Sequence, residues 1–377
     1  MHKIKETLKS FEVIRKIGSG SSAKIYLLKN KETKGFCALR EVKLKRKEDL
    51  KLSMNETKAC GLKHKNIIEY EFLGVCTRPK ELKYVLDKFE ENSYSGGLGK
   101  ETILKSGIKI EHSSSPLQIE KEVVKPKKKK NSKFFQEKQI LSNLEKNTIL
   151  SEKTNGKNVS AKPYYSYYLT SYYNFTLKDY VEFRNTQFFD NKHATCISFS
   201  SQPFDCLVPF TDNEGIEKLI PAEFLVHSFS SKNTLNKSFI HFLITNVIEG
   251  VEYLHSKGLV HTDISLSNIF IGNEKDYIPK LGDFGEIQSI ETTDKKEDIY
   301  RLGILWFELL FPIKTTSEKF HILEKIKETN SLPSEFVNAN KGEAKIIKIC
   351  LRKNKKIGIK RLLKLIKTFE KESNLSE

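Results

Sequence analysis

The sequence His-Thr-Asp-Ile-Ser-Leu-Ser-Asn at residues 261–268, followed by Leu-Gly-Asp-Phe-Gly at 281–285, decides the fold of this chain. Apolar residues at helical spacing come just before it and predict one amphipathic helix that starts near Ser238 and ends at Gly258. Two short strands are expected between the quoted segments. A helix therefore leads into a polar loop, and a strand pair leads into a second polar loop.

Three side chains in these loops suit phosphoryl transfer. That reaction needs a carboxylate that orients the attacking hydroxyl, and oxygen ligands that hold Mg²⁺ on the phosphates. Asp263 fits the first role, while Asn268, five residues later, and Asp283 fit the second. Any one of these residues could be a cap or a turn residue, but their combination after the predicted helix favours the chemical interpretation.

A second candidate is the segment Ile-Gly-Ser-Gly-Ser-Ser-Ala at residues 17–23. Glycines let a backbone turn approach phosphates closely, and free N–H groups there attract anions. The alternative is a hairpin turn between two strands. The lysine-containing pattern of P-loop ATPases is absent, which disfavours that class of enzyme.

Composition narrows the class of protein. The chain has 377 residues, 38% of them hydrophobic, and a formal net charge of +17, which favours acidic partners such as nucleic acid, phosphate groups or acidic proteins. No apolar run approaches the ~20 residues that a membrane span needs. The N-terminus lacks an apolar secretory segment, and the six cysteines form no CxxC pair. We therefore expect an intracellular, cytoplasmic protein without a membrane partner or a zinc site.

The element pattern predicts strands first and helices later, an α+β chain with a cleft between its two parts. Three strands are expected over 11–43, a helix over 46–62 and a strand within 164–173. Further helices are expected after Thr176 and at 296–311, 317–329, 342–352 and 359–371.

Two segments interrupt this pattern. Residues 97–162 hold fifteen Lys against seven Glu, including the run at 127–130, and we interpret them as a basic, disordered insertion. The lysines could simply be solvated, or they could contact RNA, a ribosome or acidic proteins. Residues 187–236 are interpreted as a second insertion.

These stretches resemble the eukaryotic protein kinases, whose catalytic loop reads HRDLxxxN and whose metal loop reads DFG. The resemblance is greatest to the kinases of the alpha subunit of translation initiation factor 2. It rests on EGVEYLHSKGLVHTDISLSNIFI (249–271), KLGDFGEI (280–287) and KKEDIYRLGILWFELLFPIKTTSEKFHILEKI (295–326), and that family also carries a long charged insertion in its small lobe.

The resemblance implies a bilobal protein-kinase fold with a small β-rich N-lobe and a helical C-lobe. The N-lobe would comprise 1–96, the basic insertion at 97–162, and its end with the hinge at 163–174; the C-lobe would comprise 175–377. Asp298 resembles the buried aspartate that supports the catalytic loop, and His261 the histidine that braces it. ATP would be held by Ile17, Gly18, Gly20, Ala23, Ile25, Ala38, Arg40 and Glu56, with Asp263 as the catalytic residue and Asn268 and Asp283 as the Mg²⁺ ligands.

The chain departs from the family in several places. Arg40 stands where the family has a phosphate-anchoring lysine, and a planar guanidinium does not replace an ammonium conservatively. Thr262 replaces the arginine that holds a phosphorylated activation loop. Ser265 replaces the lysine that neutralises the transferred phosphate. Only fourteen residues separate Asp283 from Asp298, and no APE motif is present.

Three functions remain open from the sequence. The first is a divergent serine/threonine kinase that uses MgATP and acts on a protein such as translation initiation factor 2 alpha. A homodimer is compatible with this function. The second is a pseudokinase that serves as a binding or scaffolding module. The third is a small-molecule kinase of the same fold. The surviving oxygen ligands favour an enzyme, whereas Arg40, Ser265 and the short activation segment favour the scaffold.

Overall fold

The computed structural model of the chain describes residues 2–19, 23–44, 47–79, 82, 163–173, 175–189, 207–211, 217–221, 228–229, 235–271, 277–352 and 357–374. The chain divides into two compact units. Unit 1 comprises Met1–Gly61 and Glu69–Tyr172, and unit 2 comprises Leu62–Ile68 and Tyr173–Glu377. The basic insertion expected at 97–162 lies outside the described residues.

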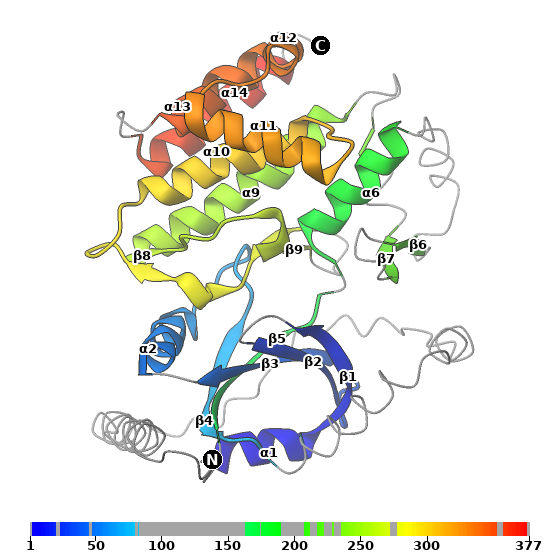
Figure 1. The fold of residues 1–377 in the computed structure, drawn as a ribbon, viewed down its shortest axis with the longest axis vertical. Helices are drawn as coiled ribbons and strands as arrows, with labels where there is room; N and C mark the ends of the chain where they lie inside the picture. Colours follow the sequence, from blue (N-terminus) through cyan, green and yellow to red (C-terminus); the bar gives the residue numbers. More distant parts are fainter. Residues whose placement is uncertain are drawn as a thin grey trace, which may run out of the picture. The chain divides into compact units, whose positions relative to one another are not determined.

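Unit 1 is built on an antiparallel sheet of five strands in the order β1-β2-β3-β5-β4 (Figure 1). The strands are β1 (Phe11–Ser19), β2 (Ala23–Asn30), β3 (Phe36–Leu44), β4 (Tyr70–Thr77) and β5 (Tyr164–Ser171). Apolar and aromatic residues such as Leu39 and Tyr167 alternate towards the core and give these segments strand character. The three strands expected over 11–43 are confirmed.

Two helices complete unit 1. α1 (His2–Ser10) was not expected from the sequence; it buries Ile4 and Leu8, one turn apart, in the same core as Leu39 of the sheet. α2 (Lys47–Glu56) passes into the short 3₁₀ helix η1 (Thr57–Ala59), so the helix expected over 46–62 ends early. The chain then turns at Gly61, whose φ of +80° suits a residue without a Cβ.

Unit 2 is mainly helical, with α9 beside α10 and α14 (Figure 1). Its helices are α6 (Leu177–Phe189), α9 (Lys237–Ser256), α10 (Lys296–Leu310), α11 (Thr316–Thr329), α12 (Ser334–Ala339), α13 (Lys341–Leu351) and α14 (Ile359–Asn374). The long helix expected before residue 258 is confirmed as α9, which Asn236 caps by accepting from the Phe239 amide at 3.2 Å. The sequence missed α12, a six-residue helix too short to show a period.

Three small antiparallel pairs accompany the helices of unit 2. They are β6 (Leu207–Thr211) with β7 (Glu217–Pro221), β8 (Leu259–Val260) with β11 (Gln288–Ser289), and β9 (Ile269–Ile271) with β10 (Pro279–Leu281). The β6–β7 hairpin and the end of α6 fall inside the range 187–236. Within the described ranges, no helix combines the length and apolar character that a membrane crossing requires.

Tight packing of α9 against the segment before β4 generates a first prediction. A Cβ at Gly250 would lie 2.9 Å from the Asn66 carbonyl oxygen and 2.9 Å from Leu281 Cδ1, closer than real Cβ atoms come. Because backbone cannot yield as a flexible side chain can, we expect Gly250→Ala to lower the free energy of unfolding by about 1–3 kcal/mol. Urea unfolding followed by circular dichroism would measure it.

Gly358→Ala is the matched control, since a Cβ there meets no atom within 4 Å. We expect this variant to unfold like the wild type or slightly later, because alanine restricts the unfolded chain. An equal loss in both variants would contradict the packing explanation.

Candidate functional site

The loop between β8 and β9 is anchored by one buried carboxylate. Asp298, on the first turn of α10, is fully buried and accepts hydrogen bonds from the amides of His261 at 2.9 Å and Thr262 at 2.8 Å. It also lies 2.8 Å from His255 Nε2 of α9. Hydrogen bonds to an ionised acceptor are stronger than neutral ones, so helices α9 and α10 jointly fix the start of the loop.

His261 connects this loop to the segment that carries Asp283. Its Nε2 donates to the Gly282 carbonyl at 3.0 Å, and its Nδ1 accepts from the Asp263 amide at 3.3 Å. The Gly282 amide in turn donates to the Asn268 carbonyl at 2.9 Å. A side chain at 282 would overlap Phe270, which explains the glycine. The backbone carrying Asp263, Asn268 and Asp283 is therefore cross-linked within unit 2.

Thr262 has a left-handed backbone, with φ of +65°. This conformation is strained for a β-branched residue and costs on the order of 1–3 kcal/mol. Two hydrogen bonds hold it: its amide donates to Asp298, and its hydroxyl donates to the Glu286 carbonyl at 2.7 Å. Thr262 thus links the loop to the segment after Asp283. The same residue stands in place of the arginine that would bind a phosphorylated activation loop.

Asp263 and Asn268 are in direct contact. Asn268 Nδ2 donates to the Asp263 main-chain oxygen at 2.9 Å and to Asp263 Oδ2 at 2.8 Å. The other carboxylate oxygen, Oδ1, accepts from Arg301 Nη1 at 3.2 Å. The Asp263 carboxylate is thereby held at both oxygens, and each oxygen retains a lone pair for a further donor.

Asn268 and Asp283 offer oxygens of the kind that Mg²⁺ prefers. Because Asn268 Nδ2 points at Asp263, its Oδ1 is the atom left to meet a cation. Asp283 adopts a left-handed backbone, φ +52°, and accepts from the Gly285 amide at 3.3 Å. No cluster of three or more His, Cys, Asp or Glu suited to a metal occurs in the described ranges. Two protein oxygens suit a Mg²⁺ ion that is bound together with nucleotide phosphates. They suit less well an ion that is coordinated by protein alone.

In unit 1, most of the residues expected to contact nucleotide lie on one face of the sheet. Gly18 pairs with Ile25, Ile25 with Arg40, and Ala23 with the residue two positions beyond Arg40. Ala38, two positions before Arg40, shares its face, because side chains alternate along a strand. Ile17 lies at the irregularity of β1 just before Gly18, and Gly20 lies outside the described residues.

Arg40 is the centre of a polar cluster on that face. Its Nη1 forms an ion pair with Glu56 of α2 and donates to the Tyr70 hydroxyl at 3.3 Å, and the Tyr70 hydroxyl also donates to Glu56. Burial and the Glu56 carboxylate hold the pKa of Tyr70 well above its ordinary value. Lys43, the nearest lysine along the chain to Arg40, is exposed. The roles of Arg40 and Glu56 towards a nucleotide stay predictions.

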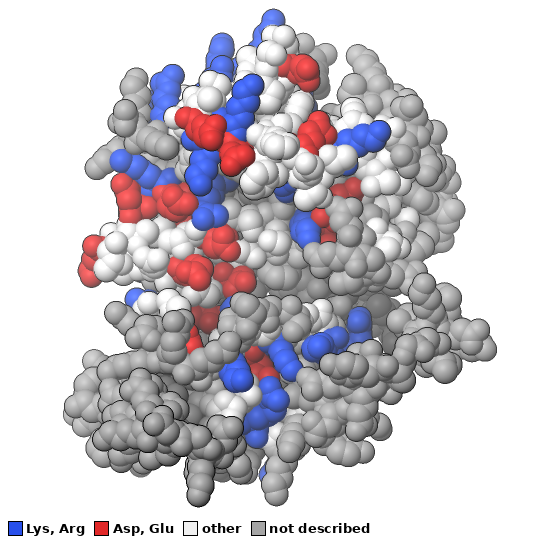
Figure 2. Space-filling model, viewed as in Figure 1, with Lys and Arg blue, Asp and Glu red and all other residues white. Residues whose placement is uncertain are grey.

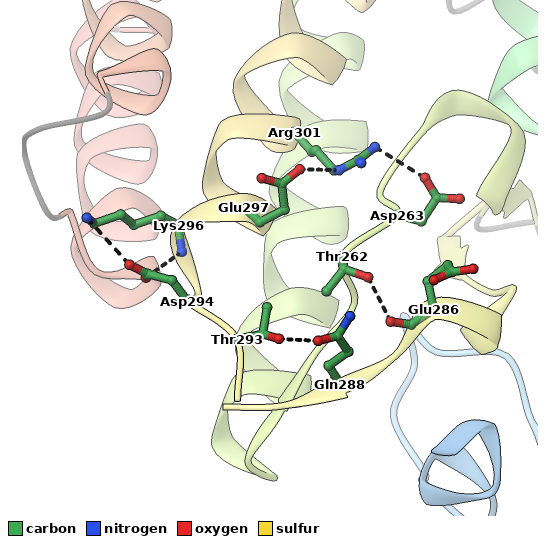
Figure 3. A pocket seen from close by; sticks show the side chains of 9 residues that line it. All are labelled: Thr262, Asp263, Glu286, Gln288, Thr293, Asp294, Lys296, Glu297 and Arg301. Carbon is green, nitrogen blue, oxygen red and sulfur yellow. Dashed lines mark hydrogen bonds and ion pairs between the residues drawn. The ribbon is translucent and has the colours of Figure 1, made fainter. Parts of the chain in front are cut away.

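A cavity of about 650 Å³ opens beside Asp263 within unit 2 (Figure 3). Asp263, Thr262 and Arg301 line it, together with residues of the short segment between Asp283 and Asp298. Acidic side chains gather over that segment (Figure 2). The β11–β8 pairing and the Thr262–Glu286 bond hold the segment against the loop.

Sequence reasoning missed two residues that contact the expected ones, Tyr70 and Arg301. Tyr70 carries no sequence signal, because a tyrosine in a strand usually packs. Arg301 carries a weak one: it lies one turn after Asp298 on the same helix, so it faces the loop that Asp298 anchors. The absence of a cation at Ser265 could have prompted a search for one elsewhere.

The bonds made by Asp298 generate a second prediction. Asp298→Asn keeps the size of the side chain but turns one acceptor into an N–H₂ group that faces a loop amide or His255. Since an unsatisfied buried group costs about 1–3 kcal/mol, we expect the free energy of unfolding to fall by at least about 2 kcal/mol. Chemical denaturation would measure this. Asp294→Asn, at a 60% exposed side chain just before the same helix, should change it by less than about 0.5 kcal/mol; similar losses would contradict the anchor.

The sequence of the chain is similar to sequences of known proteins. The sequence pattern of the protein kinase domain matches residues 216–298. The eIF-2-alpha kinase GCN2 of Arabidopsis thaliana is 27% identical over 160 residues, which cover 32% of this chain and 13% of the relative. The interferon-induced, double-stranded RNA-activated protein kinase of Mus musculus is 30% identical over 135 residues, 29% of this chain and 26% of the relative.

A third relative, the eukaryotic translation initiation factor 2-alpha kinase 3 of Bos taurus, is 28% identical over 127 residues, 24% of this chain and 11% of the relative. The chain thus spans only a minor part of the length of these relatives. The strand-rich unit 1, the helical unit 2 and the loops around Asp263 and Asp283 agree with these matches. The chain is therefore similar to eukaryotic protein kinases and, among them, to kinases of the alpha subunit of translation initiation factor 2.

Proposed function

We propose that this chain is an active serine/threonine kinase that transfers the γ-phosphate of MgATP to a protein hydroxyl. The observation that carries the proposal is the contact between Asn268 Nδ2 and both the main-chain oxygen and Oδ2 of Asp263. A loop with a purely structural role does not require a half-exposed carboxylate that is held at both oxygens. Together with the cross-link through His261 and Gly282, this contact supports a preorganised phosphoryl-transfer site.

In the proposed reaction, the Asp263 carboxylate orients the substrate hydroxyl and takes its proton as the hydroxyl oxygen attacks the γ-phosphorus. Asn268 Oδ1 and the Asp283 carboxylate would hold Mg²⁺. When bound, the ion would neutralise charge on the phosphates. In unit 1, the segment from Gly18 to Ala23 would approach the phosphates, Ala38 would contact adenine, and Arg40 would provide a positive charge that Glu56 keeps in place.

The names of the relatives suggest the protein substrate. Relatives of this chain are kinases of translation initiation factor 2 alpha, so we propose that protein as the substrate and the cytoplasm as the place of action. Contact of the basic insertion with RNA or acidic proteins, and a homodimer, stay predictions, as does the division of the N-lobe around residues 97–162.

A pseudokinase is the second candidate, and the Arg40 cluster favours it. The guanidinium is already engaged by Glu56 and Tyr70, and it is bulkier than the lysine that the family carries at this position. The third possibility, a small-molecule kinase, has no observation in its favour. The two leading candidates differ in one measurable property, phosphate transfer.

A pair of variants separates them. Asp263→Asn should lower transfer from radiolabelled ATP to purified translation initiation factor 2 alpha by a hundredfold or more, since a positioned acid–base group contributes about 10²–10⁴. It should leave nucleotide affinity nearly unchanged, because Asp263 meets the hydroxyl and not ATP. Asp283→Asn should instead weaken the Mg²⁺-dependent part of nucleotide binding, measured by calorimetry with and without Mg²⁺.

Glu335→Gln, on the exposed face of α12, is the control and should behave as the wild type. Equal transfer by wild type and Asp263→Asn would overturn the enzyme and leave the scaffold. Transfer to other proteins but not to this factor would overturn only the substrate.

The short segment after Asp283 generates a prediction about regulation. Ser289, Thr292 and Thr293 could accept a phosphate, but Thr262 cannot pair with it, and Glu286 and Asp294 nearby would repel its charge of about −1.5 to −2. Their hydroxyls or carbonyls are also engaged locally, as in the Thr292 bond to the Ser289 carbonyl at 3.0 Å. We expect activity that does not depend on phosphorylation of this segment.

The measurement compares transfer before and after phosphatase treatment and in the Ser289→Ala, Thr292→Ala, Thr293→Ala triple variant. Rates should agree within a few fold. A tenfold loss in either experiment, equivalent to about 1.4 kcal/mol of transition-state stabilisation, would establish a phosphate switch and refute this expectation.

A further inference from the structure

Arg301 brings a guanidinium to the catalytic aspartate from outside the catalytic loop. It lies on α10, three residues after Asp298, and its Nη1 donates to Asp263 Oδ1 at 3.2 Å (Figure 3). Its Nε donates to Glu297 Oε1 at 2.8 Å, one turn earlier on the helix. The same anchor that fixes the loop, Asp298, therefore also fixes the helix turn from which Arg301 reaches Asp263.

The catalytic loop itself has no cation near this aspartate. Ser265 stands where the kinases have a lysine, and its hydroxyl bonds to the Ser267 hydroxyl at 3.0 Å. Lys296, the other basic residue lining the cavity, pairs with Asp294 at 3.4 Å. Among the residues that line this cavity, Arg301 alone places a positive charge in contact with Asp263.

The guanidinium is oriented and still has donors to spare. Glu297 holds Nε and Asp263 holds one N–H of Nη1, whereas Nη2 donates to no acceptor in the described part of the chain. The side chain is 36% exposed and lines the cavity. The guanidinium is planar, its Nε and Nη1 are held by carboxylates, and its Nη2 is available. Such a group suits a hydrogen bond to an oxygen of a phosphoryl group.

We propose that Arg301 supplies, from helix α10, the positive charge that the catalytic loop lacks at Ser265. This inference rests on the proposed kinase function. As the bond forms between the substrate oxygen and the γ-phosphorus, the bond from phosphorus to the bridging oxygen of ADP breaks, ADP keeps that electron pair, and the substrate proton passes to Asp263. Arg301 holds Asp263 Oδ1 through Nη1 and neutralises the transferred phosphoryl group through Nη2.

This assignment predicts a rescue at a second site. Arg301→Ala should lower kcat at least tenfold with KM for ATP within about twofold, because the charge acts on the transferred group and not on nucleotide binding. Arg301→Lys should retain part of the rate. The double variant Arg301→Ala, Ser265→Lys should regain most of it, because it restores a cation on the loop.

Transfer from MgATP is measured to two acceptors, translation initiation factor 2 alpha and dephosphorylated casein, with thermal unfolding recorded for every variant. Lys296→Ala is the matched control, a cation of the same helix and cavity that does not touch Asp263; it should keep the wild-type rate. Arg301→Ala should unfold near the wild-type temperature, because exposed ion pairs contribute little stability.

Each outcome is decisive. A tenfold loss in Arg301→Ala with rescue by Ser265→Lys establishes the assignment. An Arg301→Ala rate within twofold of an active wild type, or above it, overturns the assignment and leaves the kinase function intact. A slow variant that also unfolds early and is not rescued reveals a structural role and overturns it too. A wild type inactive towards both acceptors overturns the proposed function and this inference together.

Discussion

The buried carboxylate of Asp298 is the interaction on which the described site depends. It joins three elements, because it accepts from two loop amides, meets His255 of α9 and belongs to the first turn of α10. A charge without access to water is tolerated only when several donors surround it. Here those donors are the backbone of His261 and Thr262, so the burial that makes the charge costly also fixes the loop. The strained backbone of Thr262 is stable only because these bonds over-determine it.

Positive charge is placed differently in this chain than in the kinases that it resembles. Both lysines that the family places on phosphates are absent, at Arg40 and at Ser265, and in each case an arginine is found in contact with a carboxylate: Arg40 with Glu56, and Arg301 with Asp263. An arginine is planar, permanently charged and able to serve two acceptors at once, so it can hold a carboxylate and keep an edge for a phosphate. The unit 1 cluster also includes the Tyr70 hydroxyl, which further restricts the guanidinium.

The short segment between Asp283 and Asp298 is held in place by the same network of hydrogen bonds. Its two ends are fixed, one through Gly282 and His261, the other through Asp298 itself. The hydroxyl of Thr262 and the β11–β8 pair hold its first half. A segment tied at so many points has little freedom to rearrange, and the cavity beside it is built from the segment and α10 together.

Local sequence determined much of this protein. Periodicity predicted α9. Motif spacing singled out Asp263, Asn268 and Asp283, whose roles stay predictions, and the resemblance to protein kinases pointed to Asp298, which is buried against the loop. The resemblance to protein kinases rests on the same residues, and the order of predicted strands and helices indicated the α+β fold. The sequence did not predict helix α1, because this helix is stabilised by its packing against the sheet. Contacts between distant residues, Arg40 with Tyr70 and Arg301 with Asp263, were decided by tertiary structure alone, since sequence spacing carries no record of which side chains meet when a helix folds against a loop.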